Sequence, residues 1–437
     1  MQRGKALSVL TWHYFGIKFP FLRYIWIKKS YVPEIFMKKL FTLILTIAVL
    51  AAIPFLPCVQ CAASSDVFTA ADKQSESRNV IAELVPFEVN ADSAVLMDTA
   101  TGTIMYAKNA NRALPPASVT KIMTLLLFME EVDAGNISLD DDISVSEYAA
   151  SMGGSQVFLE PGETMKAEEL LKCVIIASAN DAAVALAEKV AGSEEAFVKC
   201  MNERAAELGM TDTHFENVTG LDDDTTNHLT SAYDIALMSR ELLKHETIMK
   251  YSTIWMDTIR NGEFGLTNTN RLIRFYDGAT GLKTGSTSKA GFCMSATARR
   301  DGLHLIAVIM GASTRDIRNE SAKQLLDYGF AKYSLYENPG REAGEANVIG
   351  GVKNTCRCEF GPYSQLLPKG KNKSVQEEIL LDDRIPAPIG EGERVGTVRY
   401  YLDGEVIHEA DITATESVEK ISYFGLLLKM LGIYVLK

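Results

Sequence analysis

The spacing of apolar residues changes along this chain of 437 residues and divides it into regions with different predicted structure. Residues 93–98 and 103–107 are two short, mainly apolar stretches separated by Ala100-Thr101-Gly102, and this pattern predicts a β-hairpin. From residue 139 to 243 the apolar positions mostly recur at helical spacing. After Gly278 the pattern returns to short strands. We expect adjacent antiparallel strands at 281–285, 291–298 and 303–310, with residues 299–302 (Arg-Arg-Asp-Gly) as a turn.

A nearly continuous apolar run, residues 122–129, lies between the hairpin and the helical region and follows Pro115-Pro116. Proline is favoured at the first turn of a helix, and a run with almost no polar face predicts a helix that is buried on all sides. Ser118 then falls in the first turn, and Lys121, three residues later, lies on the same face within reach of its hydroxyl. Burial lowers the pKa of a lysine from its ordinary value of about 10.4. Ser118 and Lys121 are therefore a candidate nucleophile and general base.

The Ser-x-x-Lys spacing alone does not select this site, because it occurs again at 286–289 and 417–420. A second polar segment, Ser178-Ala179-Asn180, interrupts an apolar helical pattern at 168–191. Ser and Asn are common where helices begin and end, so this segment either caps a helix junction or points into a cleft. In a cleft, Ser178 and Asn180 would pass protons or hold a substrate amide.

A third segment, Lys283-Thr284-Gly285, puts a cation, a hydroxyl and a residue without a side chain on one predicted strand. Glycine allows a ligand to approach the backbone closely, and the amide of Ser286 just beyond could donate to an oxyanion. The alternative is an exposed edge strand that ends in a tight turn.

Together, the three segments resemble the motifs of the penicillin-binding protein and serine β-lactamase superfamily, in the same order along the chain. The resemblance selects Ser118 and Lys121 from the three Ser-x-x-Lys matches. It is closer to the D-alanyl-D-alanine carboxypeptidases, the low-molecular-mass penicillin-binding proteins, and covers roughly residues 85–412. It implies an α/β fold of the α+β kind, with a transpeptidase-like domain at 85–330 in which helices flank an antiparallel sheet, and a small all-β domain at 331–412. Ala179 and Ser286 differ from the residues common in the family at these positions. These differences bear on fine substrate preference and not on the reaction class.

The resemblance also implies a role for each site residue. Ser118 would attack the carbonyl between the last two D-alanines of a peptidoglycan stem peptide, with Lys121 as the base, and form an acyl-enzyme. Ser178 would return the proton to the leaving amine. The residues expected to bind substrate are Asn180, Lys283, Thr284, Gly285, Ser286 and Arg318. Arg318 would hold the terminal carboxylate, the alternative being a surface salt bridge. No cofactor is implied, β-lactam antibiotics are expected inhibitors, and the lack of an E-x-x-L-N segment predicts slow penicillin hydrolysis.

The amino-terminal residues predict export. A basic start at Met37, an apolar run at 40–56 and small residues at 61–63 form a secretory signal peptide at 37–63. Residues 1–36 either precede the true translation start at Met37 or form a cytoplasmic leader, and residues 64–84 read as a linker. The net charge is −12 and the signal region is basic, so the exported part is more acidic still and nucleic acid is not an expected partner. Neither the seven cysteines nor the six histidines show a disulfide or metal spacing.

The carboxyl-terminal residues 413–437 predict an amphipathic membrane-anchor helix. Within residues 421–436, Ser422, Gly425, Lys429 and Gly432 recur at helical spacing among apolar residues. The stretch is shorter than the roughly 20 residues that span a bilayer, so we expect a helix on the membrane surface rather than a core helix. The family's carboxyl-terminal anchor agrees with this expectation.

Three functions remain open from the sequence. The first is a D,D-carboxypeptidase at the outer face of the cytoplasmic membrane or in the cell wall. The second is a related hydrolase, either a D,D-endopeptidase or a β-lactamase. The third is a wall-binding module without catalysis.

Overall fold

The computed structural model describes Val85 and residues 87–435, with side chains as far as Gly432. The predicted signal peptide, the residues before it and the linker at 64–84 lie outside the described residues.

A five-stranded antiparallel sheet forms the centre of the first domain, with strand order β2-β1-β9-β8-β7. Its strands are β1 (Ser93–Asp98), β2 (Ile104–Lys108), β7 (Ala279–Thr287), β8 (Gly291–Arg300) and β9 (Leu303–Ala312). The predicted hairpin at 93–107 and the three later strands are confirmed.

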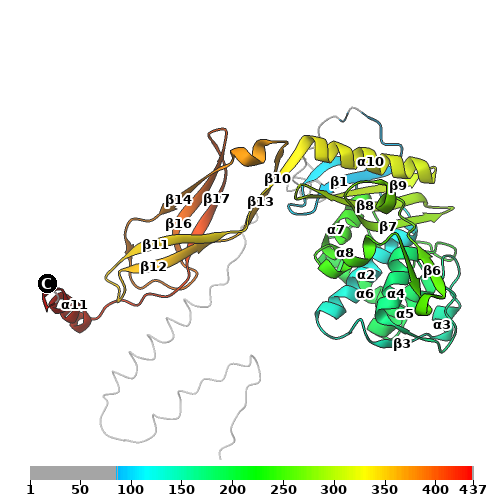
Figure 1. The fold of residues 1–437 in the computed structure, drawn as a ribbon, viewed down its shortest axis with the longest axis horizontal. Coiled ribbons are helices and arrows are strands. Elements are labelled where there is room, and N and C mark those ends of the chain that lie inside the picture. Colours follow the sequence, from blue (N-terminus) through cyan, green and yellow to red (C-terminus); the bar gives the residue numbers. More distant parts are fainter. Residues whose placement is uncertain (1–84, 86, 436–437) are drawn as a thin grey trace, which may run out of the picture. The chain divides into compact units, whose positions relative to one another are not determined.

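Both faces of the sheet are buried at its inner strands β1 and β9, because alternate residues of a strand point to opposite faces and nearly all of those in β1 and β9 are apolar. Leu96, Leu305 and Ala307 pack on the face covered by α10 (Arg315–Lys332), with Leu325 and Leu326. Their neighbours along the strands belong to the core on the other side, which contains the remaining helices of the domain (Figure 1). These helices are α2 (Lys121–Asp133), α3 (Glu147–Ala150), α4 (Ala167–Lys172), α5 (Asn180–Ala191), α6 (Glu194–Glu207), α7 (Ala232–Leu242) and α8 (Glu246–Ser252). The short helix α9 (Leu272–Phe275) packs its Leu272 into the core on the α10 face. This is the predicted α+β arrangement.

One detail of the sequence prediction is wrong. Arg299 and Arg300 do not belong to the turn after β8, since they pair with His304 and Leu303 of β9. Only Asp301 and Gly302 form the turn, with φ angles of 50° and 84°, and such a two-residue turn suits the twist of paired strands. The region 139–243, predicted to be mostly helical, includes α3, α4, α5, α6 and α7. It contains a small hairpin of β3 (Asp142–Ser144) and β4 (Thr164–Lys166), and a second one, β5 (Met256–Ile259) with β6 (Phe264–Thr267), follows it.

The second domain is made of strands, as predicted. A six-stranded sheet has the order β14-β16-β17-β12-β11-β15, and β10 pairs with β13. The strands are β10 (Tyr333–Asn338), β11 (Arg341–Ile349), β12 (Thr355–Phe360), β13 (Tyr363–Pro368), β14 (Gln376–Leu381), β15 (Ile385–Pro386), β16 (Arg394–Leu402) and β17 (Glu405–Ala414). The predicted turn at Asp403-Gly404 joins β16 to β17.

The chain then forms α11 (Tyr423–Val435), shorter than the predicted helix. In the part of the chain that the structure describes, no helix is both long and apolar enough to cross a membrane.

Candidate active site

Ser118 lies in a single 3-10 turn, Ala117–Thr120, that leads directly into α2. The turn is held by hydrogen bonds from the Val119 amide to the carbonyl of Pro116 (3.2 Å) and from the Thr120 hydroxyl to the carbonyl of Ala117 (2.9 Å). Ala117 has a φ of 49°, in a region that non-glycine residues seldom adopt. The predicted helix is therefore present, but its first turn is tighter than an α-helical turn.

Lys121 contacts Ser118 and is completely buried. Its Nζ is 3.0 Å from Ser118 Oγ, 2.5 Å from Asn180 Oδ1 and 2.8 Å from the carbonyl oxygen of Thr219. Burial, and then the charge of Lys283, holds the pKa of Lys121 well below its ordinary value. A neutral amine has two hydrogens and one lone pair, and the Asn180 and Thr219 oxygens can only accept. The two hydrogens go to these oxygens, and the lone pair is left for the Ser118 hydroxyl.

The second motif joins two helices at a sharp bend. A π-helical turn, Cys173–Ala177, ends at Ser178, whose φ is 63°, and α5 begins at Asn180. The Asn180 side chain is 1% exposed, and its Nδ2 donates to the carbonyl of Gly153 at 2.7 Å. Because Oδ1 accepts from Lys121, both ends of the amide already have partners within the protein. The structure thus gives Asn180 partners other than the predicted substrate amide.

Asp181, one residue later, fixes the loop that contains Ser155. Its buried carboxylate accepts from the backbone amides of Val157 (3.0 Å) and Leu159 (3.1 Å). The backbone amide of Asn180 donates to the carbonyl of Ser155 at 2.7 Å. The start of α5 therefore positions both the base and one wall of the cleft.

The third motif lies on β7, which passes beside the Ser118 turn. Lys283 is 1% exposed, and its Nζ donates to Ser178 Oγ at 2.7 Å and to the carbonyl of Thr284 at 2.9 Å. Burial, and then the charge of Arg318, lowers the pKa of Lys283 to about 7. A Cβ atom on Gly285 would lie 2.8 Å from the Ser118 amide nitrogen, closer than real Cβ contacts. Glycine is required here because the strand and the turn touch backbone to backbone.

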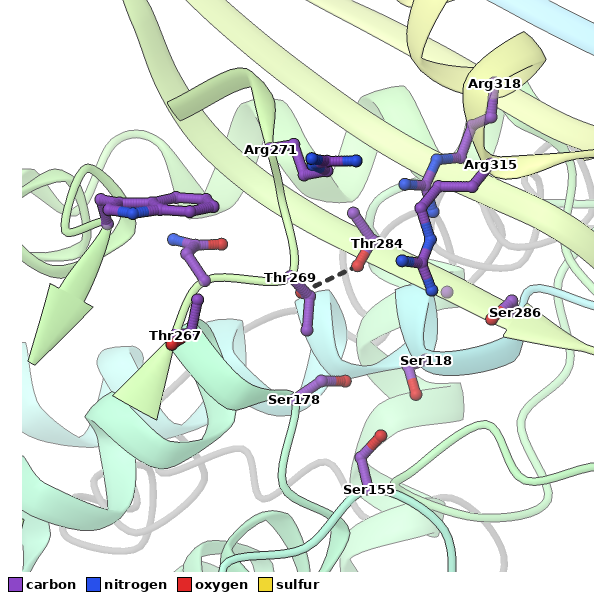
Figure 2. Close-up of a pocket in the computed structure, with 13 residues that line it drawn as sticks. Ser118, Ser155, Ser178, Thr267, Thr269, Arg271, Thr284, Ser286, Arg315 and Arg318 are labelled. Atoms are coloured by element: carbon purple, nitrogen blue, oxygen red, sulfur yellow. Dashed lines mark hydrogen bonds between the residues drawn. The ribbon is translucent and has the colours of Figure 1, made fainter. Parts of the chain in front are cut away.

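A cleft of about 360 Å³ opens over these residues (Figure 2). The predicted site residues on its walls are Ser118, Ser178, Thr284, Gly285, Ser286 and Arg318. Lys121, Asn180 and Lys283 are buried beneath them. All three motifs therefore meet at one cleft.

The comparisons with known proteins agree with this geometry. Residues 78–314 match the family described as D-alanyl-D-alanine carboxypeptidase, and residues 337–420 match the carboxyl-terminal domain of penicillin-binding protein 5. The chain belongs to the D-alanyl-D-alanine carboxypeptidase family.

Relatives of this carboxypeptidase family cover most of the chain. DacF of Bacillus subtilis is 45% identical over 349 residues, which are 78% of this chain and 89% of DacF. DacC of Escherichia coli is 33% identical over 348 residues, 77% of this chain and 86% of DacC. The crystal structure of penicillin-binding protein 5 from Haemophilus influenzae has 31% identity and a TM-score of 0.67, and it covers 77% of this chain and 100% of its own.

Arg318 projects from the first turns of α10 and is buried rather than paired at the surface. It is 3% exposed, and its guanidinium donates to Asn319 Oδ1 (2.9 and 3.1 Å) and to the carbonyl of Cys293 (3.4 Å). Burial, and then the charge of Arg315, lowers the pKa of Arg318 to about 10. The alternative of a surface salt bridge does not fit this environment.

Several wall residues of this carboxypeptidase-family cleft were not predicted from the sequence. They are Ser155, Trp255, Thr267, Asn268, Thr269, Arg271 and Arg315. One signal was present for Arg315, because it precedes the candidate Arg318 by three residues, a spacing that puts both on one face of a helix such as α10. The others come from loops and a short strand with no motif, so no local pattern marks them.

The other two Ser-x-x-Lys matches have different surroundings. Lys289 donates to the backbone carbonyl of Asp222, and Ser417 Oγ accepts from the amide of Glu391 in the second domain. Within residues 87–435, no three His, Cys, Asp or Glu side chains gather as a metal site. The five cysteines described are free thiols.

Proposed function

We propose that this chain is a serine-type D-alanyl-D-alanine carboxypeptidase that removes the terminal D-alanine from peptidoglycan stem pentapeptides through an acyl-enzyme. The observation that supports this most directly is the contact of Lys121 with Ser118 and with two oxygens that can only accept. This arrangement provides a neutral base next to a nucleophile. Membership of the carboxypeptidase family supplies the substrate class.

Acylation begins when the Ser118 hydroxyl gives its proton to Lys121 Nζ and its oxygen bonds to the carbonyl carbon of the penultimate D-alanine. The backbone amides of Ser118 and Ser286 donate to the oxyanion that forms, each worth about 10²–10³ in rate. The peptide bond then breaks, and the leaving amine receives a proton through Ser178. Water finally hydrolyses the ester, releasing the shortened peptide and restoring the Ser118 hydroxyl.

Two residues bind the substrate carboxylate in this proposal, and two others hold reacting side chains in place. Arg318 and the Thr284 hydroxyl bind the terminal carboxylate, since a guanidinium presents a fork of donors that matches two carboxylate oxygens. Lys283 holds Ser178 by the hydrogen bond between Nζ and Oγ, so it fixes the proton relay. Asn180 acts as a positioning residue for Lys121.

β-Lactam antibiotics are proposed to acylate Ser118 as inhibitors. Penicillin-binding protein D2 of Listeria monocytogenes, 31% identical over 56% of this chain with a TM-score of 0.50, has a crystal structure in the ampicillin-bound form. A strained β-lactam carbonyl would enter the same oxyanion site as the peptide.

The test is incubation of the mature chain with a pentapeptide that ends in D-Ala-D-Ala and, in parallel, with fluorescent penicillin, using Ser118→Ala as the control. Release of D-alanine and a covalent label, both lost in Ser118→Ala, are the expected results. Rapid penicillin turnover would instead indicate a β-lactamase. A chain that is never labelled would indicate a wall-binding module.

We further propose that the chain is exported and held at the outer face of the cytoplasmic membrane by α11. Large apolar side chains of this helix are at least 45% exposed: Tyr423, Phe424, Leu426, Leu427, Leu428, Met430 and Leu431. The Lys429 ammonium donates to Asn354 Oδ1 at 2.6 Å, which keeps it away from the apolar residues. An amphipathic helix of this kind binds at the lipid interface through its buried apolar area.

Sedimentation with phospholipid vesicles tests the anchor. The mature chain should bind, whereas a chain that ends at Lys420 and the double variant Leu427→Glu, Leu431→Glu should remain in solution. Equal binding of all three proteins would refute the proposal.

A further inference from the structure

Three arginines reach the same cleft, which is more than one terminal carboxylate requires. Arg271, Arg315 and Arg318 all line it, and Figure 2 shows their guanidinium groups around the space beside Thr284. Arg318 is buried and hydrogen-bonded, whereas Arg271 and Arg315 are exposed. Among the described residues, neither exposed guanidinium has a hydrogen bond or an ion pair. Arg271 has only a ring contact, 5.9 Å from the centroid of Phe275.

No carboxylate balances these charges on the walls of the cleft. Apart from the three arginines, the lining residues are Ser, Thr, Asn, Gly and Trp. Two acids on α10, Asp316 and Glu320, line a second hollow of about 240 Å³, which Arg271 and Lys323 also line. The charged residues that line the cleft are all positive, whereas the whole chain has a net charge of −12. Such a local excess of one sign attracts a ligand of the opposite sign.

The position of the two free guanidiniums indicates which part of a substrate they meet. The proposed function places the leaving residue's carboxylate at Thr284 and Arg318, with Ser118 on the acyl side. Figure 2 shows Arg271 and Thr269 on one side of Thr284 and Arg315 on the other, toward Ser286, and Trp255 also lines the cleft. A leaving residue larger than alanine would extend from the proposed carboxylate position into the space between these two guanidiniums.

We propose that Arg271 and Arg315 form a second carboxylate subsite, so that the enzyme prefers a leaving D-amino acid whose side chain ends in a carboxylate. The inference rests on the proposed function and adds the class of leaving group.

The experiment uses three acylated peptides that differ only in the last residue: D-Ala-D-Ala, D-Ala-D-Gln and D-Ala-D-Glu. The ratio of kcat/KM for the D-Glu and D-Gln peptides isolates the side-chain charge at nearly constant size. An exposed ion pair with the substrate raises kcat/KM by up to about fivefold. We therefore expect a D-Glu to D-Gln ratio of about 10 for the two arginines together. The ratio should decrease as salt is added, because the arginines are open to solvent.

Arg271→Gln and Arg315→Gln should each lower the ratio about threefold, and the double variant should bring it to about 1. Arg274→Gln is the matched control, since Arg274 lies over the Trp255 ring at 5.6 Å but does not line the cleft. That control should keep the wild-type ratio. Equal rates for the D-Glu and D-Gln peptides, or a preference that survives the double substitution, would overturn the subsite. If the D-Ala-D-Ala peptide itself is not cleaved, the proposed function fails and the subsite with it.

Discussion

Replacing Asn180 with aspartate tests whether Lys121 works as a neutral base. The substitution keeps the shape of the side chain but puts a carboxylate oxygen where the amide oxygen now accepts from Lys121 at 2.5 Å. A negative charge at this place favours the ammonium form of Lys121, which has no lone pair for Ser118. The nucleophile would then lose its base although no catalytic residue is removed.

The size of this effect follows from the distance between the two groups. Two unit charges 2.5 Å apart attract by about 6 kcal/mol at an effective dielectric constant of about 20. Burying the new carboxylate costs several kcal/mol, and about 2–3 kcal/mol of net stabilisation of the ion pair remains. Each 1.36 kcal/mol is a factor of ten in the protonation equilibrium, so this equilibrium shifts about 30- to 150-fold toward the ammonium form of Lys121.

The assay is the second-order rate constant for labelling by fluorescent penicillin, measured from pH 6 to pH 10. Asn180→Asp should acylate more slowly, by up to about 30- to 150-fold, and its rate should rise toward that of the wild type as the pH increases. Asn180→Ala is the control, because it removes the same contact without adding charge. Its acylation should be slower than that of the wild type, but the pH dependence of its rate should not move to higher pH. An Asn180→Asp profile parallel to that of the wild type would refute a neutral Lys121.

Three further predictions concern the surroundings of this pair. Gly285→Ala puts a methyl group 2.8 Å from the Ser118 amide and should lower the acylation rate at least about 10²-fold by displacing an oxyanion donor, measured by stopped-flow labelling. Asp181→Asn keeps one acceptor oxygen instead of two and should lower the free energy of unfolding in urea by about 1–3 kcal/mol. Burial lowers the pKa of His228 to about 4, so the unfolded chain binds a proton below its ordinary pKa of 6.5 and the folded chain does not. Stability is therefore lost as pH falls from 6.5 to 4, and His228→Gln should remove up to about 3 kcal/mol of this loss, measured by thermal melts across that range.

The sequence was sufficient for the parts of the site that depend on local geometry. Helical spacing predicts that Lys121 meets Ser118, and the apolar run after it predicts its burial. The strand prediction at 281–285 likewise gives, at Gly285, a position without a side chain where the backbone can touch another chain segment. Contacts between distant segments had no such signal. The carbonyl of Thr219 accepts from Lys121 across 98 residues, and nothing in the sequence around Thr219 marks that contact.

Two adjacent residues on α5 show why the rest of the site could not be predicted without the structure. Asn180 and Asp181 are adjacent, and either could have been the neighbour of Lys121. A carboxylate there would hold the lysine as an ammonium ion, whereas the amide accepts one hydrogen and adds no charge. The structure turns Asp181 away, and its oxygens accept from the amides of Val157, Leu159 and Ala182. Its charge acts on Lys121 only from a distance, and it raises the pKa less than burial and Lys283 lower it. The first turn of α5 therefore has two effects. It directs the uncharged Asn180 amide to Lys121, and it directs the Asp181 carboxylate to the backbone amides of the loop beside the cleft.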